Sequence, residues 1–104
     1  MPASSFKDFV MDQLRGLDGL NGLPMFGGTG LYSREKFFAI IYRDRLYFKT
    51  HAGNRPAYVR LGMKPFSPRP GQTLKSYYEV PAEVLEEPAR LRRWARQALE
   101  QPKA

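Results

Sequence analysis

The chain has 104 residues, with 17 basic and 10 acidic side chains and a formal net charge of +7. It contains no cysteine, which excludes a disulfide frame, a thiolate metal site and a cysteine nucleophile. The N-terminus has no apolar leader and the longest apolar run, Phe37–Tyr42, is far too short to cross a membrane. We therefore expect a soluble, cytoplasmic protein that folds as a single domain over residues 1–104, with no membrane partner.

The first predicted element is a helix over residues 5–15. Apolar residues recur there at helical spacing, so one face of the helix can pack on a core. Ser5 is predicted as the N-cap, with Asp8 completing a capping-box-like pair. Gly16 stands where a left-handed residue would end the helix. The Gly- and Asn-rich residues 17–24 are predicted to be a connecting loop.

Three strands joined by two tight polar turns are predicted next. They cover residues 25–32, 36–42 and 45–50. Simple alternation places the middle strand's side chains in two sets, Phe38, Ile40 and Tyr42 on one face and Phe37, Ala39 and Ile41 on the other. Both sets are apolar, so we expect a central strand that is covered on both faces.

The second half of the chain is predicted to alternate short helices with strands. Asn54 is the expected N-cap of a helix that ends near Leu61. The next two elements are expected to be strands at 63–67 and 73–80, joined by an irregular loop at 67–72. A helical turn at 81–85 and a last helix from 88 to 99 are expected to follow. The predicted fold is α+β and two-layered: helices pack on one antiparallel five-stranded sheet, in the order α-β-β-β-α-β-β-α.

Four segments together resemble the TfoX N-terminal domain family. They are MFGGTGLY, FFAIIYRDRLYFK, the pair Pro65-Phe66 and SYYEVPAEVLEEPARLRRWARQAL, and the resemblance covers residues 6–99. It implies helices against a five-stranded antiparallel sheet. The family's best-known members are bacterial regulators of natural competence that act with a cyclic-AMP receptor transcription factor. They carry a second, helical domain, whereas this chain is expected to be a stand-alone N-terminal domain.

The positions that match the family's motifs are expected to be structural. They are Met25, Phe26, Gly27, Gly28, Gly30, Leu31, Tyr32, Leu46, Tyr47, Lys49, Pro65, Phe66, Tyr77, Tyr78, Pro81 and Trp94. The glycines among them are followed by a strand, whereas a phosphate cradle normally opens a helix. A bulge or a close approach of two backbones is therefore favoured, with a small-ligand sensor at Gly27–Gly30 as an alternative.

Catalytic and metal chemistry find little support in the sequence. No serine has a nucleophile motif, and the single histidine, His51, stands apart from any cluster of metal-binding residues. The acidic residues near Glu83 fit helix capping and solvated charge better than paired acid–base work. We expect a protein that is not an enzyme and needs no cofactor or metal.

Basic residues in the second half of the chain are the main functional signal. They are Arg55, Arg60, Lys64, Arg69, Lys75, Arg92, Arg93 and Arg96. Interleaved aromatics, Tyr58, Phe66, Tyr77 and Tyr78, could stack on bases if they are exposed, although aromatics at such spacing are more commonly core. Tyr32, Tyr47, Tyr58 and Tyr77 are also candidates for a protein interface.

These observations predict a non-catalytic regulatory or protein-interaction module. Its expected partner is another protein, such as a transcription factor, and a second copy of the chain is also open. The alternative is direct binding of nucleic acid through the basic surface, although no helix-turn-helix or RNP-like motif accompanies the charge.

Overall fold

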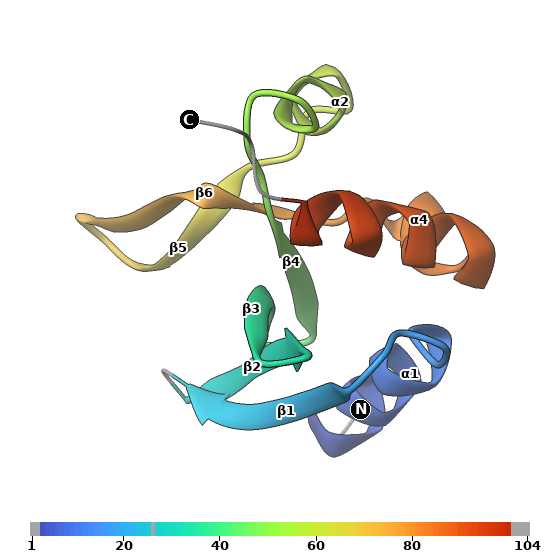
Figure 1. The fold of residues 1–104 in the computed structure, drawn as a ribbon. Helices are drawn as coiled ribbons and strands as arrows, with labels where there is room; N and C mark the ends of the chain where they lie inside the picture. Colours follow the sequence, from blue (N-terminus) through green and yellow to red (C-terminus); the bar gives the residue numbers. More distant parts are fainter. Residues whose placement is uncertain (1–2, 26, 101–104) are drawn as a thin grey trace.

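The computed structural model describes residues 3–25 and 27–100, and this part of the chain contains four helices and six strands. Their order and bounds are α1 (Ala3–Gln13), β1 (Leu20–Met25), β2 (Gly28–Ser33), β3 (Lys36–Tyr42), β4 (Arg45–Lys49), α2 (Arg55–Arg60), β5 (Pro65–Arg69), β6 (Gln72–Glu79), α3 (Ala82–Leu85) and α4 (Pro88–Leu99). The strands form one antiparallel sheet in the order β1-β2-β3-β4-β6-β5 (Figure 1).

The helices cover one face of this sheet, which confirms the predicted α+β class. Figure 1 shows α1 and α4 on the same side of the strands, while the β5–β6 hairpin extends away from them. The main core joins the helices to this face, with Val10 of α1, Phe48 of β4 and Leu91 of α4 fully buried. A second cluster, on the opposite face, consists of strand residues, including Ile40 and Phe66.

The prediction of five strands is wrong, and so is the predicted order of elements, because the described residues contain six strands and end with two helices, α3 and α4. The additional strand is β1, in the segment predicted as a loop. Gly22 and Pro24 are poor strand formers, but an edge strand tolerates both, and β1 pairs on one side only. The predicted strand 25–32 is divided, since Met25 ends β1 and Gly28 begins β2. Phe26, a family-motif position, lies outside the described residues.

The simple alternation predicted for the middle strand is also wrong. The register between β2 and β3 shifts after the pair Leu31–Ala39, so that Tyr32 pairs with Phe37 and Phe38 is left over. This bulge reverses the alternation, and Phe38 and Ala39 both join the helix-covered core. Phe37 packs instead with the cluster on the opposite face. Both faces of β3 are nevertheless apolar and covered, as predicted.

Two further boundaries differ from prediction and two agree. Helix α1 already includes Ala3, so Ser5 lies inside it and is not the N-cap. Strand β5 extends to Arg69, so the predicted irregular loop reduces to a tight turn before β6. The short helix after Asn54 and the helical turn at Ala82–Leu85 are confirmed.

Candidate functional site

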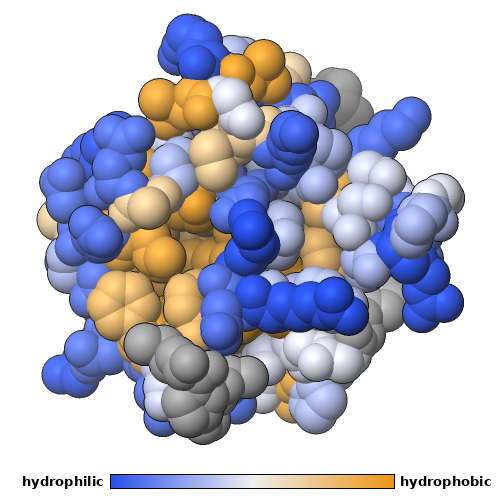
Figure 2. Space-filling view, turned by 180° about the vertical axis from the view of Figure 1, so that it is seen from behind, coloured by the Kyte–Doolittle hydropathy of each residue, from blue (hydrophilic) through white to orange (hydrophobic). Residues whose placement is uncertain are grey.

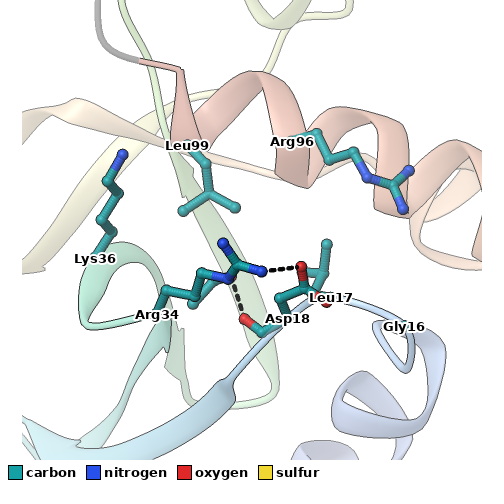
Figure 3. Close-up of a pocket in the computed structure, with 8 residues that line it drawn as sticks. Gly16, Leu17, Asp18, Arg34, Lys36, Arg96 and Leu99 are labelled. Atoms are coloured by element: carbon teal, nitrogen blue, oxygen red, sulfur yellow. Dashed lines mark hydrogen bonds and ion pairs between the residues drawn. The ribbon is translucent and has the colours of Figure 1, made fainter.

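A cleft of about 470 Å³ opens where three separate segments meet (Figure 3). The turn after α1, the β2–β3 turn with the start of β3, and the last turns of α4 each contribute side chains. The cleft is lined by Gly16, Leu17, Asp18, Ser33, Arg34, Lys36, Arg96 and Leu99. Among the residues predicted as a basic contact surface, Arg96 is the one that lines this cleft.

The β2–β3 turn places Arg34 at the centre of the cleft. It is a two-residue turn in which Arg34 and Glu35 have φ of 49° and 69°, as tight hairpins require. The Arg34 guanidinium donates to the Asp18 carboxylate at 2.8 Å, and both side chains are exposed. The hydroxyl of Ser33 donates to the backbone oxygen of Asp18 at 2.6 Å, which fixes the turn after α1 against the end of β2.

Helix α4 forms the other wall of the cleft. One side of this helix is buried, with Leu91, Trp94 and Ala98 in the core, while Arg93 and Arg96 are exposed. Arg96 faces the cleft from the last turn, whereas Arg93 is not part of its lining. Arg92 is half-buried and donates to the backbone oxygen of Gln13 at 3.5 Å, so it holds α4 against the end of α1.

The cleft carries more positive than negative charge. Its lining has three cationic side chains and one acidic side chain, and the acid, Asp18, is already paired with Arg34. Within residues 3–25 and 27–100, neither Lys36 nor Arg96 makes an ion pair. Figure 3 shows these two side chains on opposite sides of the Arg34–Asp18 pair. The arrangement can therefore bind anionic groups at two separated positions.

The other predicted basic residues are not brought together with the cleft. Arg55 is half-buried and donates to the Thr50 hydroxyl at 3.0 Å, which ties the start of α2 to the end of β4. The remaining positions, Arg60, Lys64, Arg69 and Lys75, are exposed and spread from α2 to β6. Figure 2, which shows the molecule from behind, has hydrophilic side chains over most of the face with hydrophobic ones between them.

Most of the aromatics expected to stack on bases or to form an interface are buried. Tyr58 is 1% exposed and its ring meets that of Trp94 edge-on at 4.8 Å between centroids. Phe66 and Tyr77 are buried within the second cluster, which also contains Tyr47. Burial raises the pKa of Tyr58, and it raises the pKa of Tyr77 to about 12.

Two aromatics of these sets retain some exposure. Tyr32 is half-buried at the surface of β2, in contact with Phe37, and Tyr78 is half-buried against the main core. Of the interface candidates, Tyr32 alone therefore remains accessible.

The glycine cluster shows a close contact between two strands. A Cβ on Gly28 would lie 2.2 Å from the backbone oxygen of Ile41, so only glycine allows β2 to lie where it does against β3. A Cβ on Gly30 would meet Met25 and the ring of Phe37, both at 3.1 Å. A hollow of about 190 Å³, lined in part by Lys7 and Arg43, borders this segment. Ligand binding there stays a prediction.

His51 connects two elements of the fold. Its Nδ1 accepts from the backbone N–H of Gly53 at 3.1 Å, so Nε2 carries the proton and donates to the backbone oxygen of Gln97 at 3.0 Å. The residue therefore joins the turn after β4 to the last turns of α4. Among the described residues, no group of three or more His, Asp or Glu side chains is arranged to hold a metal ion.

The remaining family-motif positions are divided between the core and the ends of elements. Leu31 and Leu46 are in the main core, Pro81 precedes α3 as its buried N-cap residue, and Pro65 opens the edge strand β5. Lys49 is half-buried at the end of β4, paired across the sheet with Tyr77.

Sequence reasoning missed three charged residues of the cleft: Asp18, Arg34 and Lys36. Arg34 lies in a turn that was correctly placed and Lys36 directly follows it, but nothing in the sequence indicates that this turn meets the last turn of α4. Asp18 lay in a segment predicted as a loop.

Comparison with known proteins gives one family. The family model described as the TfoX N-terminal domain matches residues 12–102, which is nearly the whole chain. No curated protein matches. Over residues 3–25 and 27–100, each helix is too short or too polar to cross a membrane.

Proposed function

The chain belongs to the TfoX N-terminal domain family, and from this premise we propose that it is a regulatory domain that acts by binding another protein. The resemblance described above suggests a transcription factor as that partner and competence as the kind of process regulated. The proposal includes no catalytic step: in the cleft, the Ser33 hydroxyl donates to the backbone oxygen of Asp18 and not to a side-chain base.

The basic cleft is the observation that carries this proposal. Two exposed cations, Lys36 and Arg96, stand without an ion-pair partner among the described residues, next to the apolar side chains of Leu17 and Leu99. Arginine beside partly covered apolar surface is typical of protein interfaces. A partner with acidic residues would match the charge of this wall.

The proposal is tested by affinity capture from the native host. The immobilised protein is incubated with nuclease-treated lysate, in parallel with a variant carrying Arg93→Glu and Arg96→Glu. We expect a protein that binds the unchanged chain and is lost from the variant. Circular dichroism must show that the variant is folded, which is expected because both side chains are exposed. Recovery of no specific protein contradicts the proposal.

Nucleic-acid binding is the second candidate. It is supported by the exposed residues Arg60, Lys64, Arg69 and Lys75, none of which pairs with a carboxylate among the described residues. If they contact phosphates, affinity for duplex DNA or RNA must fall steeply as salt rises, because bound counterions are released. Filter binding that shows no retention at low salt eliminates this candidate.

A further inference from the structure

We infer that the cleft between α4 and the β2–β3 turn binds an acidic segment of the partner protein, through carboxylate side chains that reach Lys36, Arg34 and Arg96. This inference rests on the proposed function and specifies its site. It also assigns a role to Asp18: its carboxylate pairs with the Arg34 guanidinium until a carboxylate of the partner takes its place.

The cleft lies at the C-terminal ends of two helices, unlike the phosphate sites that helix N-termini form. Phosphate sites commonly use the free N–H groups at the N-terminus of a helix. Here, the cleft is lined by Gly16, after the end of α1, and by Leu99, the last residue of α4. Helix C-termini carry partial negative charge, so an anion in the cleft is held by its cationic side chains, and the spacing of these cations decides which anion fits.

The spacing of the cations favours an extended ligand. Lys36 and Arg96 lie on either side of the Arg34–Asp18 pair and do not converge on one point (Figure 3). A compact anion would reach one of them, whereas a peptide with several acidic residues can reach both. Leu99, which is half-buried in the cleft wall, provides apolar contact for the aliphatic part of a side chain.

The Arg34–Asp18 pair is well suited to exchange. The side chains are 75% and 70% exposed, and ion pairs so exposed to water are weak. An incoming carboxylate can therefore replace Asp18 at little free-energy cost. The loop itself stays in place, because Ser33 binds the backbone oxygen of Asp18 and not its carboxylate.

The test uses a fluorescently labelled peptide rich in glutamate, with binding followed by anisotropy and by amide shifts. Asp18→Asn is compared with Asp12→Asn, because Asp12 is also exposed and paired with an arginine, Arg15, but lies outside the cleft. Both changes raise the net charge equally. We expect Asp18→Asn to tighten binding about two- to fivefold, and Asp12→Asn to leave it nearly unchanged.

A second matched pair tests the cationic wall. Arg96→Glu and Arg93→Glu change the same helix by the same charge, but only Arg96 lines the cleft. We expect Arg96→Glu to weaken peptide binding about tenfold and Arg93→Glu to weaken it about twofold. Amide shifts are expected at residues 16–18, 33–36 and 96–99.

Four results would overturn the inference. Equal effects within each matched pair would show attraction to overall charge alone. Amide shifts confined to residues 60–75 would place the contact elsewhere. Inorganic phosphate that shifts the cleft amides and displaces the peptide would show a phosphate site. If the Arg96→Glu and Arg93→Glu variants retain a captured partner equally, the inference is wrong but the proposed function stands. If no protein is captured, the proposed function itself is wrong.

Discussion

At the scale of single residues, buried tyrosines are the most informative side chains. Tyr58 is 1% exposed, and its hydroxyl has no hydrogen-bond partner among the described residues. Tyr47 is also buried, and burial together with the nearby Glu79 carboxylate raises its pKa. Tyr77 lies in the same cluster as Tyr47. Substitutions at these tyrosines should therefore change the free energy of unfolding by a measurable amount.

Removal of the Tyr58 hydroxyl is predicted to stabilise the protein. A buried polar group without a partner costs about 1–3 kcal/mol, so Tyr58→Phe should raise the free energy of unfolding by about 1 kcal/mol. Tyr58→Ala is the contrasting variant, and it should lose about 3–5 kcal/mol because it leaves a cavity beside Trp94. Urea unfolding measures both. If Tyr58→Phe is less stable than the original protein, the Tyr58 hydroxyl has a hydrogen-bond partner and the explanation is wrong.

The raised pKa of Tyr77 predicts that the protein loses stability at alkaline pH. Its pKa is about 12 in the folded protein against an ordinary value of 10.0, so the folded state holds the phenol proton more tightly. Its contribution is complete below pH 10 and is lost as the pH rises towards 12. The free energy of unfolding should therefore fall more steeply over this window in the original protein than in Tyr77→Phe. If the free energy of unfolding falls equally with pH in the two proteins, the raised pKa of Tyr77 is contradicted.

At the scale of elements, the hairpins of the sheet depend on strained turns and close strands. The β3–β4 turn consists of Arg43 and Asp44, with φ of 48° and 59°. Arginine is unfavourable at positive φ and aspartate is accommodated there less well than glycine, so Asn-Gly is the preferred pair for such a turn. The strand geometry thus imposes a conformation that the local sequence does not favour.

The double change Arg43→Asn and Asp44→Gly is predicted to stabilise the β3–β4 hairpin. The relief of strain should add about 1 kcal/mol to the free energy of unfolding, after the loss of the Arg43 contact with the Tyr42 ring at 5.3 Å. The midpoint of urea unfolding is the measurement. A lower midpoint would indicate that Arg43 and Asp44 do not adopt the positive-φ conformation of this two-residue turn.

Gly28→Ala tests the spacing of β2 and β3. The added Cβ would approach the Ile41 oxygen to 2.2 Å, and we expect a loss on the order of 2–3 kcal/mol. Gly27→Ala is the control, because its φ of +79° is unfavourable for alanine but nothing lies within 4 Å of the new Cβ. Its expected loss is about 1 kcal/mol. Thermal unfolding that ranks the two variants the other way would contradict the described contact.

Some elements could be predicted from sequence because their signals are local. The turns, the proline before α3 and the apolar stripe of α4 all depend on neighbouring residues. β1 could not be found in this way, since Leu20–Met25 forms a strand by pairing with β2 despite its glycine and proline. The bulge at Phe38 likewise arises from the pairing of two strands.

The cleft could be predicted only in part for the same reason. Arg96 was recognised because it lies on the polar side of an amphipathic helix. Arg34 and Asp18 come together through the packing of α1, α4 and the β2–β3 turn, which no local pattern specifies.

At the scale of the whole molecule, two groups of basic residues are relevant to binding. The formal net charge is +7. One group is the three cations of the cleft, and the other is the set of exposed bases on α2, β5 and β6. The first lines one cleft and adjoins apolar side chains, whereas the second is dispersed. This difference is why a protein partner, and not a nucleic acid, is our first proposal.

The most direct test of this account is the retention of the captured partner protein by two single variants, Arg96→Glu and Arg93→Glu. The variants share a helix, an exposed position and a change in net charge, and differ in whether the changed side chain lines the cleft. We predict that the partner stays bound to Arg93→Glu and is lost from Arg96→Glu. Equal retention by the two variants would contradict the assignment of the cleft as the binding site.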